Sequence, residues 1–190
     1  DFIDQAYRIG YKVGLVIDSY QLVEKYNSSK ISFYKILSKD VNNSNLFEAI
    51  SETSVDDIYL STGMSHYDEL DKIIPDLVNL DNRVKLIHTQ LSNEIEDVNL
   101  KAIEVMGLRY KVPIAYGHHC IDERVVYSSL GTSPESIFFY IKGDDNITYP
   151  DDFHAVKASF VNDFINNIRF LKKSIGDGVK VLMGNNLREG

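Results

Sequence analysis

The sequence predicts an α/β domain built on a parallel sheet, and three observations support this fold class. Short apolar segments rich in β-branched and aromatic residues alternate with segments that have the 3.6-residue period of helices. The apolar segments are nearly continuous, which is typical of strands buried on both faces. One strand–helix unit recurs roughly every 19 to 28 residues, the spacing of parallel α/β proteins. An open doubly wound sheet and a closed (β/α)8 barrel both have this spacing, so periodicity does not separate them.

Six segments are expected to form the strands of this sheet. They are Val13–Ile17, Ser32–Leu37, Ile58–Leu60, Val84–His88, Pro113–Tyr116 and Ser136–Ile141. A closed barrel needs eight strands. No glycine-rich phosphate-binding motif follows the first strand, and no Gly-Lys-Ser/Thr motif occurs, which argues against the nucleotide-binding form of an open sheet.

Four segments carry apolar residues at helical spacing. Their apolar stripes are Leu46, Phe47 and Ile50; Leu70, Ile73, Ile74 and Leu77; Val98, Ala102, Val105 and Met106; and Phe160, Phe164, Ile168 and Leu171. We expect the third helix to end at Gly107, because glycine is the commonest residue after a helix end. The fourth is expected from about Phe160 to Ser174, before the stop signal Gly176-Asp177-Gly178.

Composition bounds the class of protein. The chain has 190 residues, 44% of them hydrophobic and 25% charged, which suits one domain over residues 1–190. A single cysteine, Cys120, excludes a disulfide framework, favours a cytoplasmic setting and is expected to pack as an apolar residue. No apolar run approaches the roughly 20 residues that span a bilayer, so no membrane partner is expected. The net charge of −8 disfavours nucleic acid as a partner, although a local basic pocket can still bind an anion.

Polar residues stand where the predicted strands end, and ligands gather there in parallel α/β folds. Lys35 lies within an apolar segment, where a charge is costly unless it is paired or faces a ligand. It can clamp a phosphate or carboxylate, or it can lie along the sheet with its amine in solvent. After the next strand, Ser61, Thr62 and Gly63 offer hydroxyls and amides that can hold an anionic oxygen, or they form a plain N-capping turn.

The five histidines differ in their expected roles. His88 ends a strand, a position more typical of a hydrogen-bonded structural residue than of a catalyst. His118 and His119 are adjacent on a strand and point to opposite faces, so one can be a ligand while the other is structural. His66 is expected on the surface at a helix start. His154 lies in a loop before the last helix, where it can approach the pocket from the rim, although a solvated loop histidine is the more typical case.

Four motifs in this order resemble the sialic acid (N-acetylneuraminate) synthase family. They are Phe33-Tyr34-Lys35-Ile36-Leu37-Ser38, Leu60-Ser61-Thr62-Gly63-Met64, Asp97-Val98-Asn99-Leu100-Lys101-Ala102-Ile103 and Val112-Pro113-Ile114-Ala115-Tyr116-Gly117-His118-His119. Enzymes of that family condense phosphoenolpyruvate with an N-acetylated hexose such as N-acetylmannosamine. They have a (β/α)8 barrel, followed in many members by a small antifreeze-like domain.

The resemblance implies a partial barrel. The first strand here resembles the third strand of the family, so the implied fold is a (β/α)8 TIM-type barrel that lacks its first two strands, with six strands visible. The family's catalytic glutamate lies in the part without a counterpart. No antifreeze-like domain is expected, because the sequence ends at Gly190. Exposed strand edges need a cover, so we expect a homodimer or a companion chain.

The resemblance also implies roles for particular residues. Lys35 and Ser38 match the motif that holds phosphoenolpyruvate, and Ser61 and Asn99 match residues of the same binding network. His88 matches a histidine of the substrate site.

His119 matches a histidine that binds the family's ion, Mn2+ or Mg2+. The second metal-binding histidine of the family is replaced by Tyr140, and a carboxylate by Phe138. Tyrosine is a poor ligand for such ions because its phenol stays protonated at neutral pH.

Three functions follow from these observations. The first is a diverged phosphoenolpyruvate-dependent nonulosonic acid synthase with an amino-sugar substrate. The second is an inactive family member that acts as a binding or scaffold subunit in surface-polysaccharide biosynthesis. The third is an unrelated barrel lyase or aldolase in which Lys35 forms a Schiff base. No catalytic residue is assigned from the sequence.

Overall fold

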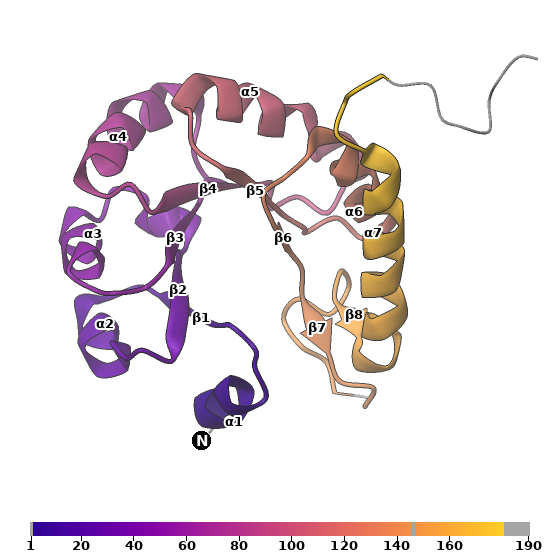
Figure 1. Ribbon diagram of the computed structural model, residues 1–190, viewed down its shortest axis with the longest axis horizontal. Helices are drawn as coiled ribbons and strands as arrows, with labels where there is room; N and C mark the ends of the chain where they lie inside the picture. The colour runs from indigo at the N-terminus through magenta and orange to yellow at the C-terminus, as the bar shows by residue number, and fades with distance from the viewer. Residues whose placement is uncertain (1, 146, 181–190) are drawn as a thin grey trace, which may run out of the picture.

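The computed structural model describes residues 2–145 and 147–180 of the chain. Within them, six parallel strands form one curved sheet in the order of the sequence, and helices line its outer side (Figure 1). The strands are β1 (Val13–Ile17), β2 (Ile31–Ile36), β3 (Asp57–Ser61), β4 (Val84–Thr89), β5 (Ile114–Gly117) and β6 (Ile137–Phe138). The predicted parallel α/β class is confirmed. The strand order never reverses, so the sheet is part of a (β/α)8 barrel and not a doubly wound sheet.

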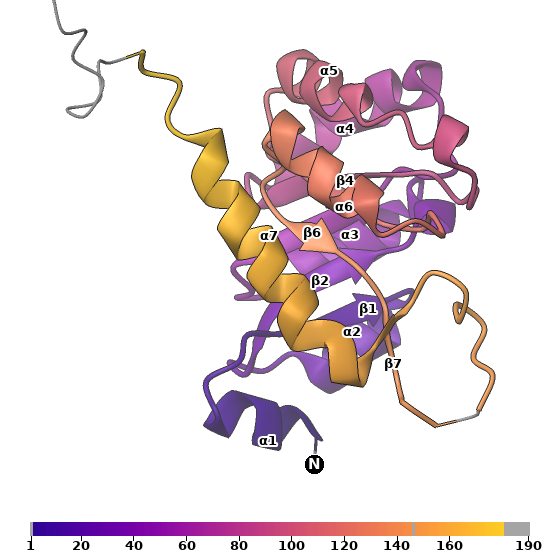
Figure 2. The same cartoon turned by 90° about the vertical axis from the view of Figure 1, so that its right-hand side faces the viewer.

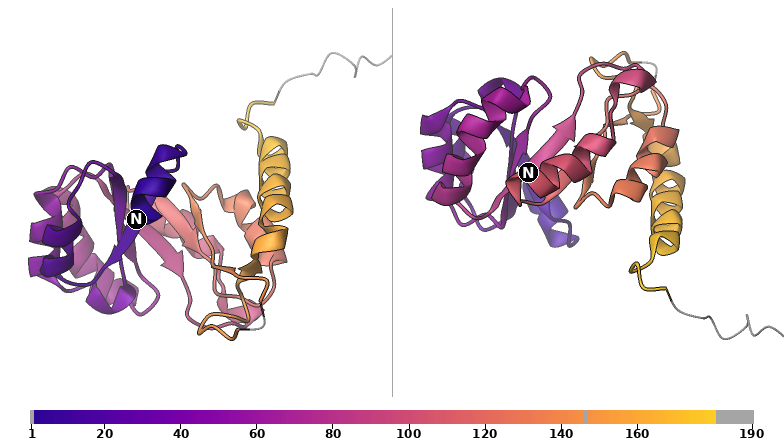
Figure 3. Two further views of the ribbon diagram at one scale, coloured as in Figure 1. Left: turned by 90° about the horizontal axis from the view of Figure 1, so that it is seen from below. Right: turned by 90° about the horizontal axis from the view of Figure 1, so that it is seen from above.

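The helices wrap the outer side of this half-barrel. They are α1 (Phe2–Arg8), α2 (Tyr20–Tyr26), α3 (Ser44–Ser51), α4 (Tyr67–Leu80), α5 (Lys101–Tyr110), α6 (Arg124–Ser129) and α7 (Val161–Ile175). Views from below and above show α2, α3 and α4 on one side of the molecule and α7 on the opposite side (Figure 3). The start of α3 follows from its sequence, because the Asn43 side chain accepts a hydrogen bond from the Leu46 N–H.

Two apolar clusters occupy the two faces of the sheet. The larger one lies between the sheet and the helices, and it includes Tyr34, Ile36, Leu60, Leu86 and, as predicted, Cys120. The smaller one lies on the inner face, and it consists of Tyr59, Ile87 and Ala115 with Phe33 and Phe138 packed against them. Successive side chains of a strand point to opposite faces, so both faces of these strands are apolar.

The predicted sixth strand, Ser136–Ile141, is wrong in its length. Its neighbour β5 ends at Gly117, and the last bond between the two strands runs from the His118 N–H to the Phe138 carbonyl oxygen, 2.9 Å. Beyond that point no strand edge remains to pair with. The chain instead forms a separate two-stranded sheet of β7 (Ile141–Lys142) and β8 (Val156–Lys157), and the segment around them projects from one side of the molecule (Figure 2).

Two helix predictions also need correction. The third predicted helix does not end at Gly107; α5 continues to Tyr110 and ends at Lys111, whose φ is 56°. Gly107 lies inside the helix, where a Cβ would make only an ordinary van der Waals contact with Ile114 at 3.6 Å. Val105 is 41% exposed and so does not belong to the buried stripe. Phe160 is 61% exposed and belongs to a 3-10 turn that precedes α7, so it is not part of the buried stripe.

The half-barrel is open along its two edge strands, β1 and β6. Among the described residues β1 and β6 each have one neighbouring strand, and Val16 of β1 is 53% exposed. None of the helices in the described ranges is long and apolar enough to cross a bilayer. Asp1, Asn146 and the end of the sequence at Gly190 lie outside the described residues.

Candidate active site on the inner face of the sheet

Lys35 stands above an aromatic floor on the inner face. The rings of Phe33, Tyr59 and Phe138 meet edge to face, with centroid distances of 5.0 to 6.1 Å. The Lys35 Nζ lies 5.4 Å from the centroid of Phe138, a cation–π distance. Burial lowers the pKa of the Lys35 amine, and the negative charge of Asp151 opposes that shift. The lysine is half-buried and turned toward the barrel interior rather than along the surface.

A charged network supports this floor at the amino ends of the strands. The Lys85 Nζ lies 2.9 Å from the Asp57 Oδ1 and 2.6 Å from the Glu135 Oε1. The Tyr59 hydroxyl donates to the other Glu135 oxygen at 2.9 Å. Since Tyr59 belongs to the aromatic floor, the network fixes the surface beneath Lys35.

Three rings gather at the carboxyl end of β5. The centroid of the His119 ring is 5.0 Å from that of His154 and 5.4 Å from that of Tyr140, and His154 and Tyr140 are 4.8 Å apart. The prediction that His154 is a solvated loop residue is wrong, because its side chain is 1% exposed. Both of its ring nitrogens are buried without a hydrogen-bond partner among the described residues.

Burial keeps both imidazoles neutral at pH 7. Burial, with smaller contributions from His154 and Lys35, lowers the pKa of His119 to about 4, and Asp151 opposes them. Burial also lowers the pKa of His154, again against Asp151, whose Oδ1 lies 4.0 Å from the His154 Nε2. Neutral imidazoles can bind a metal ion or accept a proton. Burial raises the pKa of Tyr140, so its phenol stays protonated.

The donor set fits a divalent cation in kind, although it is small. Among the described residues no group of three or more His, Cys, Asp or Glu side chains surrounds one point. Two neutral imidazoles do lie side by side, and the nitrogens of His154 lack partners. Imidazoles that share an ion at about 2.1 Å from each nitrogen have ring centres roughly 4.5 to 5.5 Å apart. Water or substrate oxygens would complete such a site.

His118 turns away from this cluster. It is 2% exposed, and its Nδ1 lies 3.1 Å from the Tyr116 hydroxyl, on the helix-facing side of the sheet. The prediction that His118 and His119 point to opposite faces is confirmed. His66 is exposed at the start of α4, as predicted.

His88 and Asn99 lie apart from Lys35. The His88 Nε2 is 2.9 Å from the Val98 carbonyl oxygen, and β-strand alternation places the ring on the helix-facing side. His88 and Asn99 together line a second, polar cavity of about 210 Å³ that also includes Thr62 and Ser65. Asn99 takes the left-handed conformation, φ 48°. Their substrate-binding roles stay predictions, and Lys35 does not line this cavity.

The two predicted serines flank the Lys35 side of the site. Ser61 ends β3 and is buried on the same face as Tyr59, two residues before it. Ser38 is buried in the turn that follows β2, the strand of Lys35. The structure therefore gathers Lys35, Ser61 and His119 on the inner face, with Ser38 at its rim. The binding roles of these residues also remain predictions.

Several residues of the site were not found from the sequence. Thr89 of β4 has a buried hydroxyl oxygen without a partner among the described residues. In the sequence, Phe33 and Tyr59 cannot be distinguished from ordinary core residues. Their contact on the inner face depends on the curvature of the sheet. For His154 the sequence left open an approach to the pocket from its rim, and the structure places the ring there beside His119.

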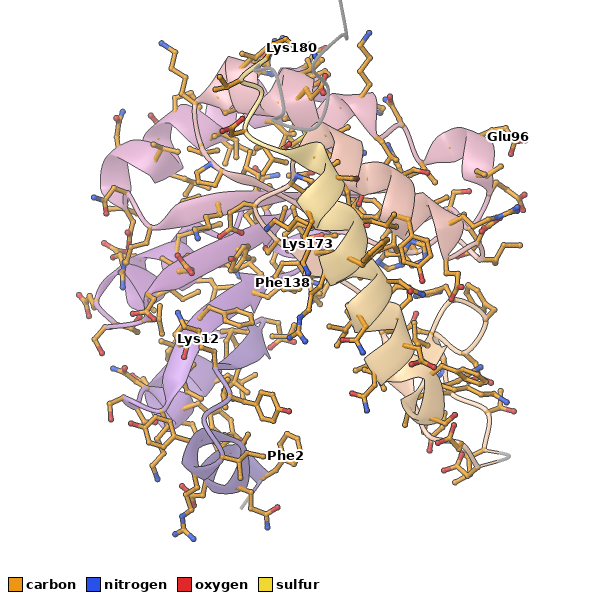
Figure 4. The ribbon with its side chains drawn as sticks, turned by 45° about the vertical axis from the view of Figure 1, so that its right-hand side comes forward. Phe2, Lys12, Glu96, Phe138, Lys173 and Lys180 are labelled. Carbon is orange, nitrogen blue, oxygen red and sulfur yellow. The ribbon has the colours of Figure 1, made fainter. Side chains whose placement is uncertain are left out.

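Phe138 of β6, whose ring packs on the inner face, lies near the centre of the view in Figure 4. A lysine near the end of β2 and a histidine just after β5 follow the site pattern of (β/α)8-barrel proteins, whose ligands bind at the carboxyl ends of the strands. The model of the NeuB family matches residues 18–180, and the chain belongs to this family.

Curated relatives agree with that assignment. The chain is 28% identical over 179 residues to an uncharacterized protein of Methanocaldococcus jannaschii, covering 90% of this chain and 53% of that protein. It is 23% identical to the N,N'-diacetyllegionaminic acid synthase of Campylobacter jejuni, covering 83% of this chain and 48% of the synthase. The chain thus spans about half the length of the curated relatives it matches.

Solved structures share the fold. The N-acetylneuraminic acid synthetase of Leptospira borgpetersenii superposes with a TM-score of 0.87 at 18% identity, over 100% of this chain and 71% of that one. The spore coat polysaccharide biosynthesis protein spsE of Bacillus subtilis gives a TM-score of 0.82 at 15% identity, over 94% of this chain and 52% of that one. These likenesses support the barrel assignment.

Proposed function

We propose that the chain is a diverged phosphoenolpyruvate-dependent nonulosonic acid synthase that uses an N-acetylated hexose such as N-acetylmannosamine. The observation that carries this proposal is the Lys35 amine on the inner face, 5.4 Å from the Phe138 ring and close enough to His119 to affect its pKa. The positively charged Lys35 amine can bind the anionic end of a substrate, and the neutral imidazoles lie where the reacting end would be. Membership of the NeuB family and the names of the synthase relatives support the same chemistry.

The proposed reaction joins two substrates and releases phosphate. The C3 carbon of phosphoenolpyruvate forms a bond to the aldehyde carbon of the open-chain sugar, and the aldehyde oxygen takes up a proton. One water adds to C2, and the C2–oxygen bond to phosphate breaks. The products are a 2-keto-3-deoxy acid and inorganic phosphate, so one water is consumed for each phosphate released.

Each residue of the candidate site has a proposed role in this reaction that follows from its side-chain chemistry. Lys35 binds the phosphate or carboxylate through a charge-assisted contact. The hydroxyls of Ser38 and Ser61 donate hydrogen bonds to the same anion. The ring of His119, whose pKa of about 4 keeps it neutral at pH 7, has a nitrogen lone pair available to bind a cation near the aldehyde oxygen. A divalent cation, Mn2+ or Mg2+, held by His119 would polarise the aldehyde when bound.

A binding or scaffold subunit is the second candidate, and Phe138 favours it. Its ring occupies the position beneath Lys35 where the resemblance implies a carboxylate. If the chemistry is lost, Lys35 still provides an anion pocket. In either case we propose a cytoplasmic protein whose open edges at β1 and β6 are covered by a homodimer or a companion chain.

A phosphate-release assay tests the synthase directly. Phosphoenolpyruvate, N-acetylmannosamine and Mn2+ are incubated with the wild type, with Lys35→Ala and with Lys173→Ala. Lys173 is an exposed lysine of α7 and serves as the control (Figure 4). We expect sugar-dependent phosphate release that Lys35→Ala reduces at least tenfold and Lys173→Ala leaves unchanged. Release without sugar, or equal release from all three proteins, contradicts the proposal.

A further inference from the structure

His154 is a buried polar residue that the described structure leaves unsatisfied. Its side chain is 1% exposed, and neither ring nitrogen has a hydrogen-bond partner among the described residues. Buried polar groups are almost always paired, because an unpaired one loses its hydration without compensation. Its nearest ring neighbours are His119, Tyr140 and Phe153, all within 5.0 Å between centroids. A bound group would satisfy the nitrogens that these rings leave unpaired.

We propose that His154 is the second imidazole ligand of a divalent cation, paired with His119 of β5. His154 would take over the role that a strand histidine has in the family and that Tyr140 cannot fill. The choice of Mn2+ or Mg2+ as the ion rests on the proposed function. Two observations carry the pairing: the 5.0 Å between the ring centroids and the unpartnered nitrogens of His154.

The chain itself brings His154 to this position. The Val156 N–H donates to the Tyr140 carbonyl oxygen at 2.9 Å, where β8 pairs with β7. The Lys142 Nζ donates to the Asp152 carbonyl oxygen at 2.6 Å and forms an ion pair with its carboxylate at 2.9 Å. These contacts bring the residues before β8 back toward β7. His154 therefore lies beside Tyr140, the residue at the position of the family's second metal-binding histidine.

Other nearby groups are less suited to be the second ligand. Tyr140 carries a protonated phenol, and His118 faces Tyr116 on the other side of the sheet. The Asp151 side chain is 47% exposed, and its Oδ1 lies 4.0 Å from the His154 Nε2. The negative charge of Asp151 still favours a cation beside His119 and His154. An anionic substrate would lie between that cation and Lys35.

Manganese provides a probe that does not depend on catalysis. Mn2+ is titrated into the untagged full chain and free ion is followed by electron paramagnetic resonance, while electron spin-echo modulation counts bound imidazole nitrogens. The variants are His154→Ala, His119→Ala and the control His66→Ala, a histidine exposed outside the site. We expect two bound imidazoles in the wild type and in His66→Ala. Each of the other variants should retain one and bind Mn2+ at least tenfold more weakly.

A rescue variant separates loss of a ligand from loss of the fold. Adding Tyr140→His to His154→Ala should restore the second imidazole, because the Tyr140 ring lies 5.4 Å from that of His119. The proposal is overturned if His154→Ala keeps two imidazoles, or if wild-type Mn2+ has none. Bound Mn2+ with two imidazoles but no phosphate release supports this site and contradicts only the proposed synthase activity.

Discussion

Removing the Lys85 side-chain charge tests how the inner face is held together. In Lys85→Met, the carboxylates of Asp57 and Glu135 lose the amine that lies 2.9 and 2.6 Å from them. The three side chains are only 18 to 30% exposed, so water replaces that amine poorly. Breaking a fully buried ion pair costs about 3–5 kcal/mol. Discounted for partial exposure, we expect a loss of about 2–3 kcal/mol, or roughly 4–12 °C in Tm for a chain of this size.

Thermal unfolding followed by circular dichroism measures this loss, with Lys12→Met as the control. Lys12 also pairs with an aspartate, but the two side chains are 75% and 64% exposed, so its variant should melt like the wild type. Equal melting temperatures for Lys85→Met and Lys12→Met would refute the argument, because they would mean that burial adds nothing to the Lys85 pairs.

The same network predicts a pH dependence. Burial alone would raise the pKa of Glu135, but hydrogen bonds from Lys85, Ser136 and Tyr59 outweigh it and hold the pKa below its usual value. A carboxyl with a lowered folded pKa stabilises the protein above its unfolded pKa of about 4.3, and that stabilisation disappears as the pH falls through the folded value. The difference in unfolding free energy between the wild type and Lys85→Met should therefore shrink below about pH 4.

Three further predictions concern single positions. Tyr140→His combined with Phe138→Glu should raise Mn2+ affinity in a calorimetric titration, and no gain would mean that the last strand is wrongly aligned with the family. Arg83→Met should cost about 2–4 kcal/mol in urea unfolding, since its guanidinium binds three backbone carbonyls and the Asp81 carboxylate; a loss below 1 kcal/mol would contradict this. Gly117→Ala should cost about 1–2 kcal/mol, because its Cβ would lie 3.0 Å from Ile87 and from Thr89, and an unchanged Tm would refute it.

The sequence predicts the strands well because their signal is local. Val13–Ile17 and the apolar segments after it are continuous and flanked by turn residues, so their ends fall within a residue or two of the observed strands. The last strand fails for a reason that is not local. Phe139 and Tyr140 have strand-forming side chains, but β5 ends at Gly117 and offers them no edge to pair with.

The sequence predicted the position of a site residue only where the alternation of side chains along a single strand determines the face to which that residue points. His118 and His119 could be assigned to opposite faces, because neighbouring residues of a strand point in opposite directions. The burial of His154 could not be predicted, because it depends on Lys142 binding Asp152 and on β8 returning to β7. These contacts join residues across a loop that carries no periodic pattern.

Calorimetric titration of phosphoenolpyruvate, with and without Mn2+, tests the central claim most directly. The proposed synthase should bind phosphoenolpyruvate more tightly when Mn2+ is present, and Lys35→Ala should weaken that binding about 10- to 150-fold, equivalent to a lost charge-assisted contact of about 1.5–3 kcal/mol. Binding that Mn2+ leaves unchanged would indicate the anion-binding subunit instead. Binding that Lys35→Ala leaves unchanged would contradict the account of the inner face.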